Sequence, residues 1–321
     1  MRIGLVFLTA AIVFTLGTQP KPVSSSDAWP TKAVSIYVGY PVGTPADLEA
    51  RQLAQGLRKI LGQPVVVVDV PGGNAEISLK DILELPADGY SFLFVTKDST
   101  YPWANPKTSY PVSDFQAIAE LTAEATSFYV RSDSPFKTLP DLVDYARKNP
   151  GRLTVSTFGT LSALAQDVAK LETAAKIDLK CVPYGGGPAQ VAAVLGGHAD
   201  AGLGTTSNFY NLTKAGKIRI LAVASPVHPY PFLPDVPTLS QYGYDFTDFF
   251  WRGIVARRGT PDDFVQRMAQ AIKSVTTTQE WKDYEQRQVQ VGTYAGPVDF
   301  GKTLVNDVDE ARRANPAVCG K

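Results

Sequence analysis

Short apolar runs alternate with amphipathic stretches along most of this chain, a pattern that predicts an α/β protein. In the first third, three runs are rich in β-branched and aromatic residues and predict buried strands: residues 34–38, 65–68 and 91–95. Between them, apolar residues recur at helical spacing from Pro45 up to Gly62, a glycine that suits the C-terminal end of a helix, and again from Ile77 to Leu85. This order predicts a right-handed doubly wound unit.

From Pro135 the same alternation begins again and predicts a second α/β lobe. A strand at 128–131 precedes it. The expected helices then cover residues 139–148, 163–175 and 189–195, and the further strands cover 153–156, 179–182, 199–203 and 218–224. A strand at 251–256 and helices at 262–275, 279–288 and 297–313 are expected to return to the first lobe. We therefore divide the chain into lobe 1 (29–126 plus 249–321) and lobe 2 (127–248), with crossings near residues 127 and 248.

Two junctions of strand, glycine loop and helix stand out. At the first, Thr44 suits the N-cap, Pro45 the first helical position and Asp47 the third, which predicts a capping box. The second runs from Thr157 to Ser162. Each junction directs backbone N–H groups and the positive end of a helix dipole toward the space above its strand, which suits a carboxylate or phosphate. Two well-capped helices without a ligand would give the same pattern.

The composition limits the classes of binding partner to expect. The chain has 321 residues, 44% of them apolar, and its 31 Lys and Arg balance its 31 Asp and Glu. It is long enough for two domains, and its neutral balance gives no indication of a nucleic-acid or membrane surface. We expect a monomer.

The N-terminus indicates export. Arg2 precedes an apolar stretch from Ile3 to Leu16 and a segment rich in Pro and Ser, the layout of a secretory signal peptide. We assign residues 1–28 to a cleaved signal peptide and expect a periplasmic protein. In an oxidising compartment Cys181 and Cys319 are candidates for a disulfide, although nothing in the sequence fixes their distance.

The sequence offers little for catalysis. His198 and His228 have no carboxylate or cysteine at ligand spacing, and neither a nucleophile elbow nor a nucleotide-binding loop is present. We therefore predict no metal, no cofactor and no enzymatic activity. An exported hydrolase or transferase is the weaker alternative.

Nine segments in order resemble the tripartite tricarboxylate transporter substrate-binding (Bug-type) proteins. They are WPTKAV at 29–34, YPVGTPAD at 40–47, LGQPVVV at 61–67, DGY at 88–90, VPYGG at 182–186, LGGHAD at 195–200, AGKIR at 215–219, LPDVPT at 233–238 and GTP at 259–261. Each segment is weak alone, but together they cover nearly the whole chain after residue 28.

The resemblance implies a two-lobed periplasmic-binding-protein fold of the type 2-like, Venus flytrap kind, each lobe a doubly wound sheet flanked by helices. It also implies a non-enzymatic receptor that closes on a small organic acid and delivers it to the membrane components of a tripartite tricarboxylate transporter. An accessory protein that presents the ligand to a signalling partner is the alternative.

In that family the loop after the first strand and its lobe 2 counterpart hold the ligand carboxylates. Carried over, these loops and the neighbouring strand ends give the candidate site Tyr40, Gly43, Thr44, Pro45, Ala46, Asp47, Thr96, Phe158, Gly159, Thr160, Ser162, Tyr184 and Thr205. Thr44 stands where the family has a second glycine, and Leu161 where its other loop has one. These departures favour a small or aromatic carboxylate over citrate.

Overall fold

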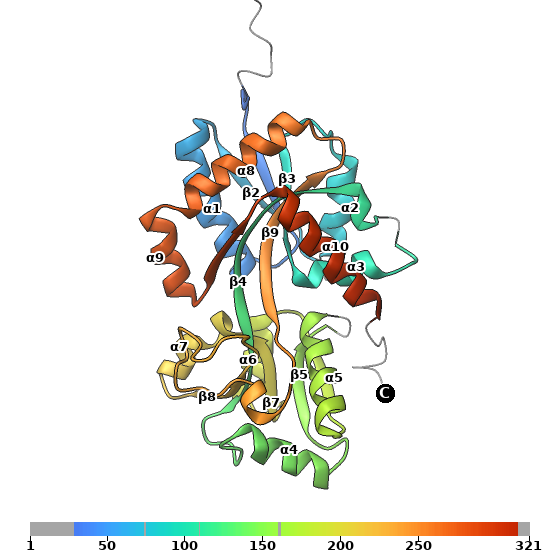
Figure 1. Ribbon diagram of the computed structural model, residues 1–321, viewed down its shortest axis with the longest axis vertical. Coiled ribbons are helices and arrows are strands. Elements are labelled where there is room, and N and C mark those ends of the chain that lie inside the picture. Colours follow the sequence, from blue (N-terminus) through green and yellow to red (C-terminus); the bar gives the residue numbers. More distant parts are fainter. Residues whose placement is uncertain (1–28, 74, 109, 160–161, 314–321) are drawn as a thin grey trace, which may run out of the picture.

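Two lobes stacked along the long axis make up the molecule (Figure 1). The computed structural model describes residues 29–73, 75–108, 110–159 and 162–313. The predicted signal peptide, Thr160, Leu161 and Cys319 therefore lie outside the described residues, and so does the predicted disulfide. Cys181 is half-buried. No helix in these ranges is long and apolar enough to cross a membrane.

Lobe 1 is built on three parallel strands in the order β2-β1-β3: β1 (Val34–Val38), β2 (Val65–Asp69) and β3 (Ser91–Thr96). Strand β9 (Phe249–Arg257) pairs antiparallel with β3, and β10 (Val291–Ala295) pairs with β4. The helices of this lobe are α1 (Pro45–Leu61), α2 (Glu76–Glu84), α3 (Thr100–Ala104), α8 (Asp262–Thr276), α9 (Gln279–Gln288) and α10 (Pro297–Arg313).

Lobe 2 contains the parallel strands β7-β5-β6, with β5 (Thr154–Phe158) between β7 (Ala201–Thr205) and β6 (Lys180–Tyr184), while β8 (Ile218–Val223) pairs with β4. Its helices are α4 (Leu139–Lys148), α5 (Ala163–Ala175), α6 (Gly187–Leu195) and α7 (Tyr210–Lys214).

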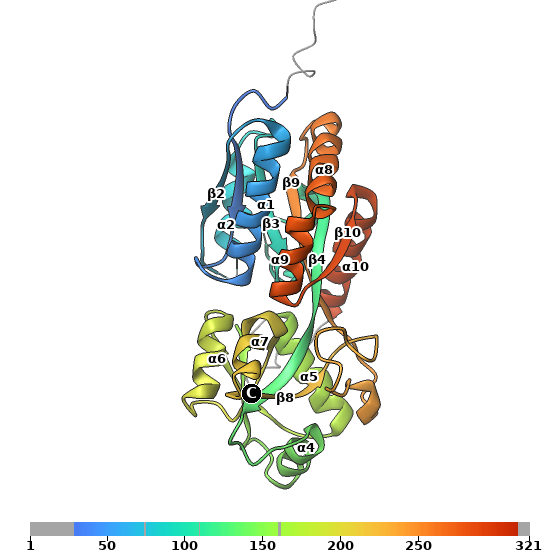
Figure 2. The ribbon, with the colours of Figure 1, turned by 90° about the vertical axis from the view of Figure 1, so that its left-hand side faces the viewer.

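Strand β4 (Phe115–Arg131) runs through both lobes as one long strand (Figures 1 and 2). Its residues up to Ala125 pair with β9, and those from Thr126 onward pair with β7 and β8. The sequence predicted only its last four residues as a strand. That prediction was too short because Thr122 and Glu124 interrupt the apolar pattern, although both side chains are fully buried.

Each lobe packs its helices on its sheet through apolar faces. In lobe 1, α1 and α8 bury Leu53, Leu57, Met268 and Ile272 over the strands. A separate core joins Phe128 of β4 to the helices of lobe 2. Burying apolar surface stabilises the folded state by about 25 cal/mol per Å². The packing of these faces is therefore the main stabilising contribution. The lobes thus have their own cores and share one long strand.

Candidate ligand-binding site

A cavity lies between the two lobes and opens to solvent, with about 500 Å³ of space free of atoms when its mouth is included. Lobe 1 contributes residues from the loop after β1, the end of β3 and β9, and lobe 2 contributes residues from the ends of β5, β6 and β7. The described lining is Tyr40, Pro41, Thr44, Pro45, Ala46, Thr96, Asp98, Phe158, Leu164, Gly185, Gly186, Gly187, Gln190, Thr205, Asn208, Phe250 and Arg252. Strand ends of both sheets therefore converge on one space, where α/β sheets commonly bind ligands.

The side chain of Tyr40 spans the lobe interface. Its hydroxyl lies 2.7 Å from Thr96 Oγ1, and its ring lies 6.2 Å from that of Phe158 in lobe 2. Burial raises the pKa of the Tyr40 hydroxyl above its usual range, so this group stays neutral. Tyr40 thus offers the cavity an aromatic face and a hydroxyl.

The start of α1 differs from the predicted capping box. Thr44 is the N-cap residue, but its hydroxyl donates to Pro41 O at 2.7 Å and does not cap the helix. Asp47 accepts from Gly43 N at 2.8 Å, one residue before the N-cap, while Thr44 N donates to Pro41 O, so neither half of the predicted box forms. Gly43 has a φ of +82°, a conformation that glycine adopts without a Cβ clash. The first turn of α1 therefore keeps no side-chain cap from Thr44.

The N-terminus of α5 is engaged by the protein itself. Ser162 Oγ accepts from Ala165 N at 3.1 Å, and Asp98 Oδ1, from lobe 1, accepts from Ala163 N at 2.9 Å. Asp98 is 2% exposed, and burial raises the pKa of its carboxyl to about 7. A carboxylate of the opposite lobe thus occupies the helix end that the sequence assigned to the ligand.

The N-terminus of α6 has no side-chain cap. Its N-cap residue is Gly186, and the turn from Gly185 to Gly187 lines the cavity. A Cβ on Gly187 would lie 2.3 Å from Oδ1 of Asn208, so the close approach of Asn208 depends on this glycine. Asn208 Nδ2 in turn donates to Thr205 Oγ1 at 2.6 Å. This helix end offers the cavity backbone donors and a positive dipole.

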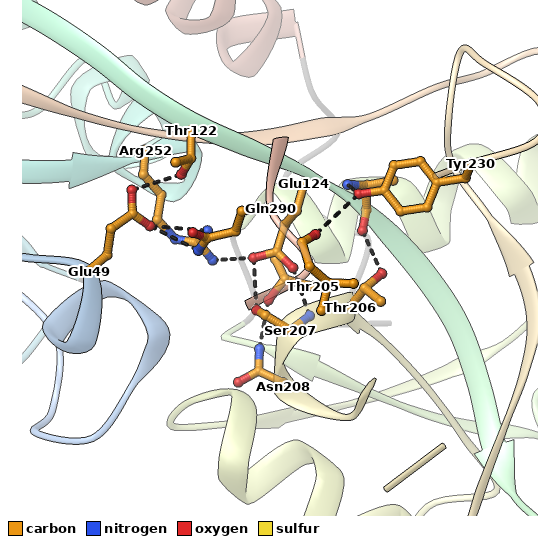
Figure 3. A network of polar contacts seen from close by, with 12 residues as sticks. Glu49, Thr122, Glu124, Thr205, Thr206, Ser207, Asn208, Tyr230, Arg252 and Gln290 are labelled. Atoms are coloured by element: carbon orange, nitrogen blue, oxygen red, sulfur yellow. Dashed lines mark hydrogen bonds and ion pairs between the residues drawn. The ribbon is translucent and has the colours of Figure 1, made fainter. Parts of the chain in front are cut away.

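A buried ionic triad, drawn in Figure 3, includes the lining residue Arg252. Arg252 of β9 is 2% exposed and pairs with Glu124 of β4 through Nη2, while its Nη1 lies 3.6 Å from Glu49 Oε2. Burial raises the pKa of Glu49 to about 7, although Arg252 opposes that shift. The cation thus lies between two acids, since a buried charge requires a partner.

Further hydrogen bonds hold the two acids in place. Glu49 accepts from Thr122 Oγ1 at 2.7 Å and from Gln290 Nε2 at 2.9 Å. Glu124 accepts from both the backbone N and the Oγ of Ser207 in lobe 2, each at 2.8 Å. Glu124 lies where β4 passes from lobe 1 to lobe 2. The triad therefore links Arg252 in the cavity wall to Ser207 of lobe 2.

The structure brings about half of the predicted site residues into the cavity lining. Those that line it are Tyr40, Thr44, Pro45, Ala46, Thr96, Phe158 and Thr205. The described lining does not include the predicted residues Gly43, Asp47, Gly159, Ser162 and Tyr184. Four of them are next in sequence to a lining residue, and Ser162 caps the helix α5 that carries the lining residue Leu164. Thr160 lies outside the described residues. The ligand roles of all these residues stay predictions.

Sequence reasoning missed the two charged residues of the lining, Asp98 and Arg252, and the amides of Gln190 and Asn208. Asp98 follows the strand end at Thr96 that was singled out, so the same criterion extended by two residues would have found it. Arg252 sits inside an apolar strand, where no local pattern marks it. His198 and His228 are exposed, and the described residues contain no group of side chains that could hold a metal ion.

Known proteins match this chain over most of its length. Residues 49–299 match the family model described as tripartite tricarboxylate transporter family receptor. A Cupriavidus necator relative, the UPF0065 protein in the gbd 5′ region, is 29% identical over 284 residues, which cover 88% of this chain and 85% of the relative.

Solved structures match as well. The periplasmic binding protein BugD has a TM-score of 0.81 at 25% identity, covering 89% of this chain and 97% of its own. An R. palustris protein solved with adipate has a TM-score of 0.82 at 22% identity, covering 91% of this chain and 98% of its own. The predicted fold class, two α/β lobes of a periplasmic binding protein, is confirmed.

Proposed function

This chain belongs to the tripartite tricarboxylate transporter receptor family, as the sequence resemblance predicted, and on that premise we propose that it is a periplasmic solute-binding protein. It captures a small organic carboxylate between its lobes and delivers it to the membrane components of a tripartite tricarboxylate transporter. It binds its ligand and does not transform it.

The observation that carries the proposal is the cavity lined by both lobes, with the uncapped α6 N-terminus in its wall. Backbone N–H groups at a helix end hold a carboxylate without a fixed cation. The adipate complex of a protein with this fold is consistent with a carboxylate ligand. A ligand that contacts both lobes would favour the closed arrangement by its differential affinity for it.

A thermal-shift and calorimetric panel of mono-, di- and tricarboxylates tests the proposal. A ligand at 100 times its dissociation constant should stabilise the folded state by ~2.7 kcal/mol. We expect at least one small carboxylate to raise the melting temperature and to bind with one-to-one stoichiometry. If no carboxylate changes the melting temperature of the folded protein, the proposal is wrong.

Two tryptophan variants test whether the carboxylate binds in the cavity between the lobes. Gly185 lies in the lining, has a φ outside the left-handed region and would have no atom within 4 Å of an added Cβ. Gly185→Trp should therefore fill the cavity and abolish binding while leaving the unliganded melting temperature nearly unchanged. Ala215→Trp, at an exposed position of lobe 2, is the matched control and should bind as the unmodified protein does.

A further inference from the structure

When its acids are ionised, the cavity wall carries more negative than positive charge. Asp98 and Arg252 are the charged side chains in its described lining, and Glu49 and Glu124 adjoin Arg252 from behind. Arg252 is already paired with both glutamates, so its positive charge does not compensate Asp98. The neighbouring cation Lys97 is bound to Asp248. A ligand with two or three carboxylates would add negative charge to a buried site that already has an excess, which is costly.

Aromatic rings share this lining with Asp98. Tyr40, Phe158 and Phe250 contribute rings from both lobes, and Tyr40 and Phe250 are less than 8% exposed. Carboxylates combined with aromatic faces are the surroundings in which proteins bind ammonium groups. Donors for a carboxylate are present at the same time in the turn Gly185 to Gly187, and Arg252 Nη1 is buried without a hydrogen-bond partner.

We propose that the ligand is a zwitterion, an amino carboxylate whose ammonium group lies against Asp98 and whose carboxylate is held by the glycine turn of α6. This inference rests on the proposed function and narrows its ligand class. An amino carboxylate brings no net charge into the cavity. Its ammonium group supplies Asp98 with the cation that the described lining lacks.

Matched ligand pairs test the inference on the full mature protein. In each pair one terminal group is either an ammonium or a carboxylate: 3-aminopropanoate and succinate, 4-aminobutanoate and glutarate, 5-aminopentanoate and adipate. Calorimetry at neutral pH should give tighter binding of the amino carboxylate in at least one pair, by a factor of ten or more. A preference for the dicarboxylate in every pair that binds would overturn the inference.

The variant Asp98→Asn removes the charge and keeps an oxygen that accepts from Ala163 N, so the lobe contact is preserved. Loss of one partner of a buried charge pair should weaken the amino carboxylate ~30-fold or more. The dicarboxylate should bind as before or more tightly. Asp235→Asn, the same change at an exposed position of lobe 2, should leave both affinities unchanged.

An unchanged affinity ratio in Asp98→Asn would show that Asp98 only joins the lobes, and the inference would be wrong. The proposed function fails separately. If dicarboxylates bind and amino carboxylates do not, only the zwitterion is excluded. If neither these pairs nor the wider carboxylate panel binds, the proposed function fails and this inference fails with it.

Discussion

Arg252 is the residue on which the buried polar network depends. It is the cation between Glu49 and Glu124, and all three side chains are at most 2% exposed. Removing one partner of a buried ionic group leaves an uncompensated charge that costs ~3–5 kcal/mol. We therefore expect Arg252→Met to lower the free energy of unfolding by about that amount, measured by urea denaturation at pH 7.

Two further variants show whether charge or packing is responsible. Arg152→Met, at an exposed position of lobe 2, should leave stability within ~0.5 kcal/mol of the unmodified protein. The combination of Arg252→Met with Glu49→Gln and Glu124→Gln removes all three charges and should recover part of the loss. A triple variant less stable than Arg252→Met alone would contradict the charge explanation.

At the scale of single residues, the sequence predicted the apolar and hydroxyl part of the lining better than the charged part. Tyr40 and Thr44 were found because they lie in a loop directly after a strand, where a local pattern marks them. Asp98 and Arg252 gain their roles from residues far away in the chain, Ala163 and Glu124. Only the tertiary arrangement brings such partners together, so neither role could be predicted from local sequence.

Glycine positions test the packing of elements. Gly253 lies in β9 between β3 and β4, and a Cβ there would lie 2.4 Å from the ring of Phe300 and 2.7 Å from Ala119 O. Overpacking of this kind costs ~1–3 kcal/mol. Gly253→Ala should therefore destabilise the protein by that amount in urea denaturation, because α10 must move away from the sheet.

Gly301 provides a control of opposite sign. It lies within α10, and the nearest atom to an added Cβ, that of Ala117, is 3.8 Å away. Alanine inside a helix is more favourable than glycine by ~0.5–1 kcal/mol, so Gly301→Ala should stabilise the protein. Equal effects of the two substitutions would mean that β9 does not pack against Phe300 as described.

Among the elements, most helices and parallel strands were predicted within a few residues, because periodicity and glycine or proline boundaries mark them. The N-terminus of α5 was assigned to the ligand, since nothing local indicates that Asp98 reaches it from lobe 1. The long strand β4 was largely missed. A strand buried on both faces that contains partnered polar residues has no apolar alternation to recognise.

Buried acids give the whole molecule a dependence of stability on pH. Burial raises the pKa of both Glu49 and Asp98 to about 7, whereas in the unfolded chain carboxyls titrate near ~4. Between these values the folded state holds protons that the unfolded state has released. Stability must then fall as pH rises, by up to ~1.4 kcal/mol per pH unit for each such group.

We therefore expect the unliganded protein to be more stable at pH 5 than at pH 7.5, measured as the free energy of unfolding in urea. The acids with lowered pKa, which titrate below this window and do not reverse its sign, are Asp133, Asp141, Asp248 and Glu280. Glu49→Gln removes one carboxyl with a raised pKa, so the stability of this variant should change less steeply with pH than that of the unmodified protein. Glu84→Gln, at an exposed position, should keep the original slope. A slope unaffected by Glu49→Gln would mean that this carboxyl is already ionised in the folded protein, held so by Arg252 alone.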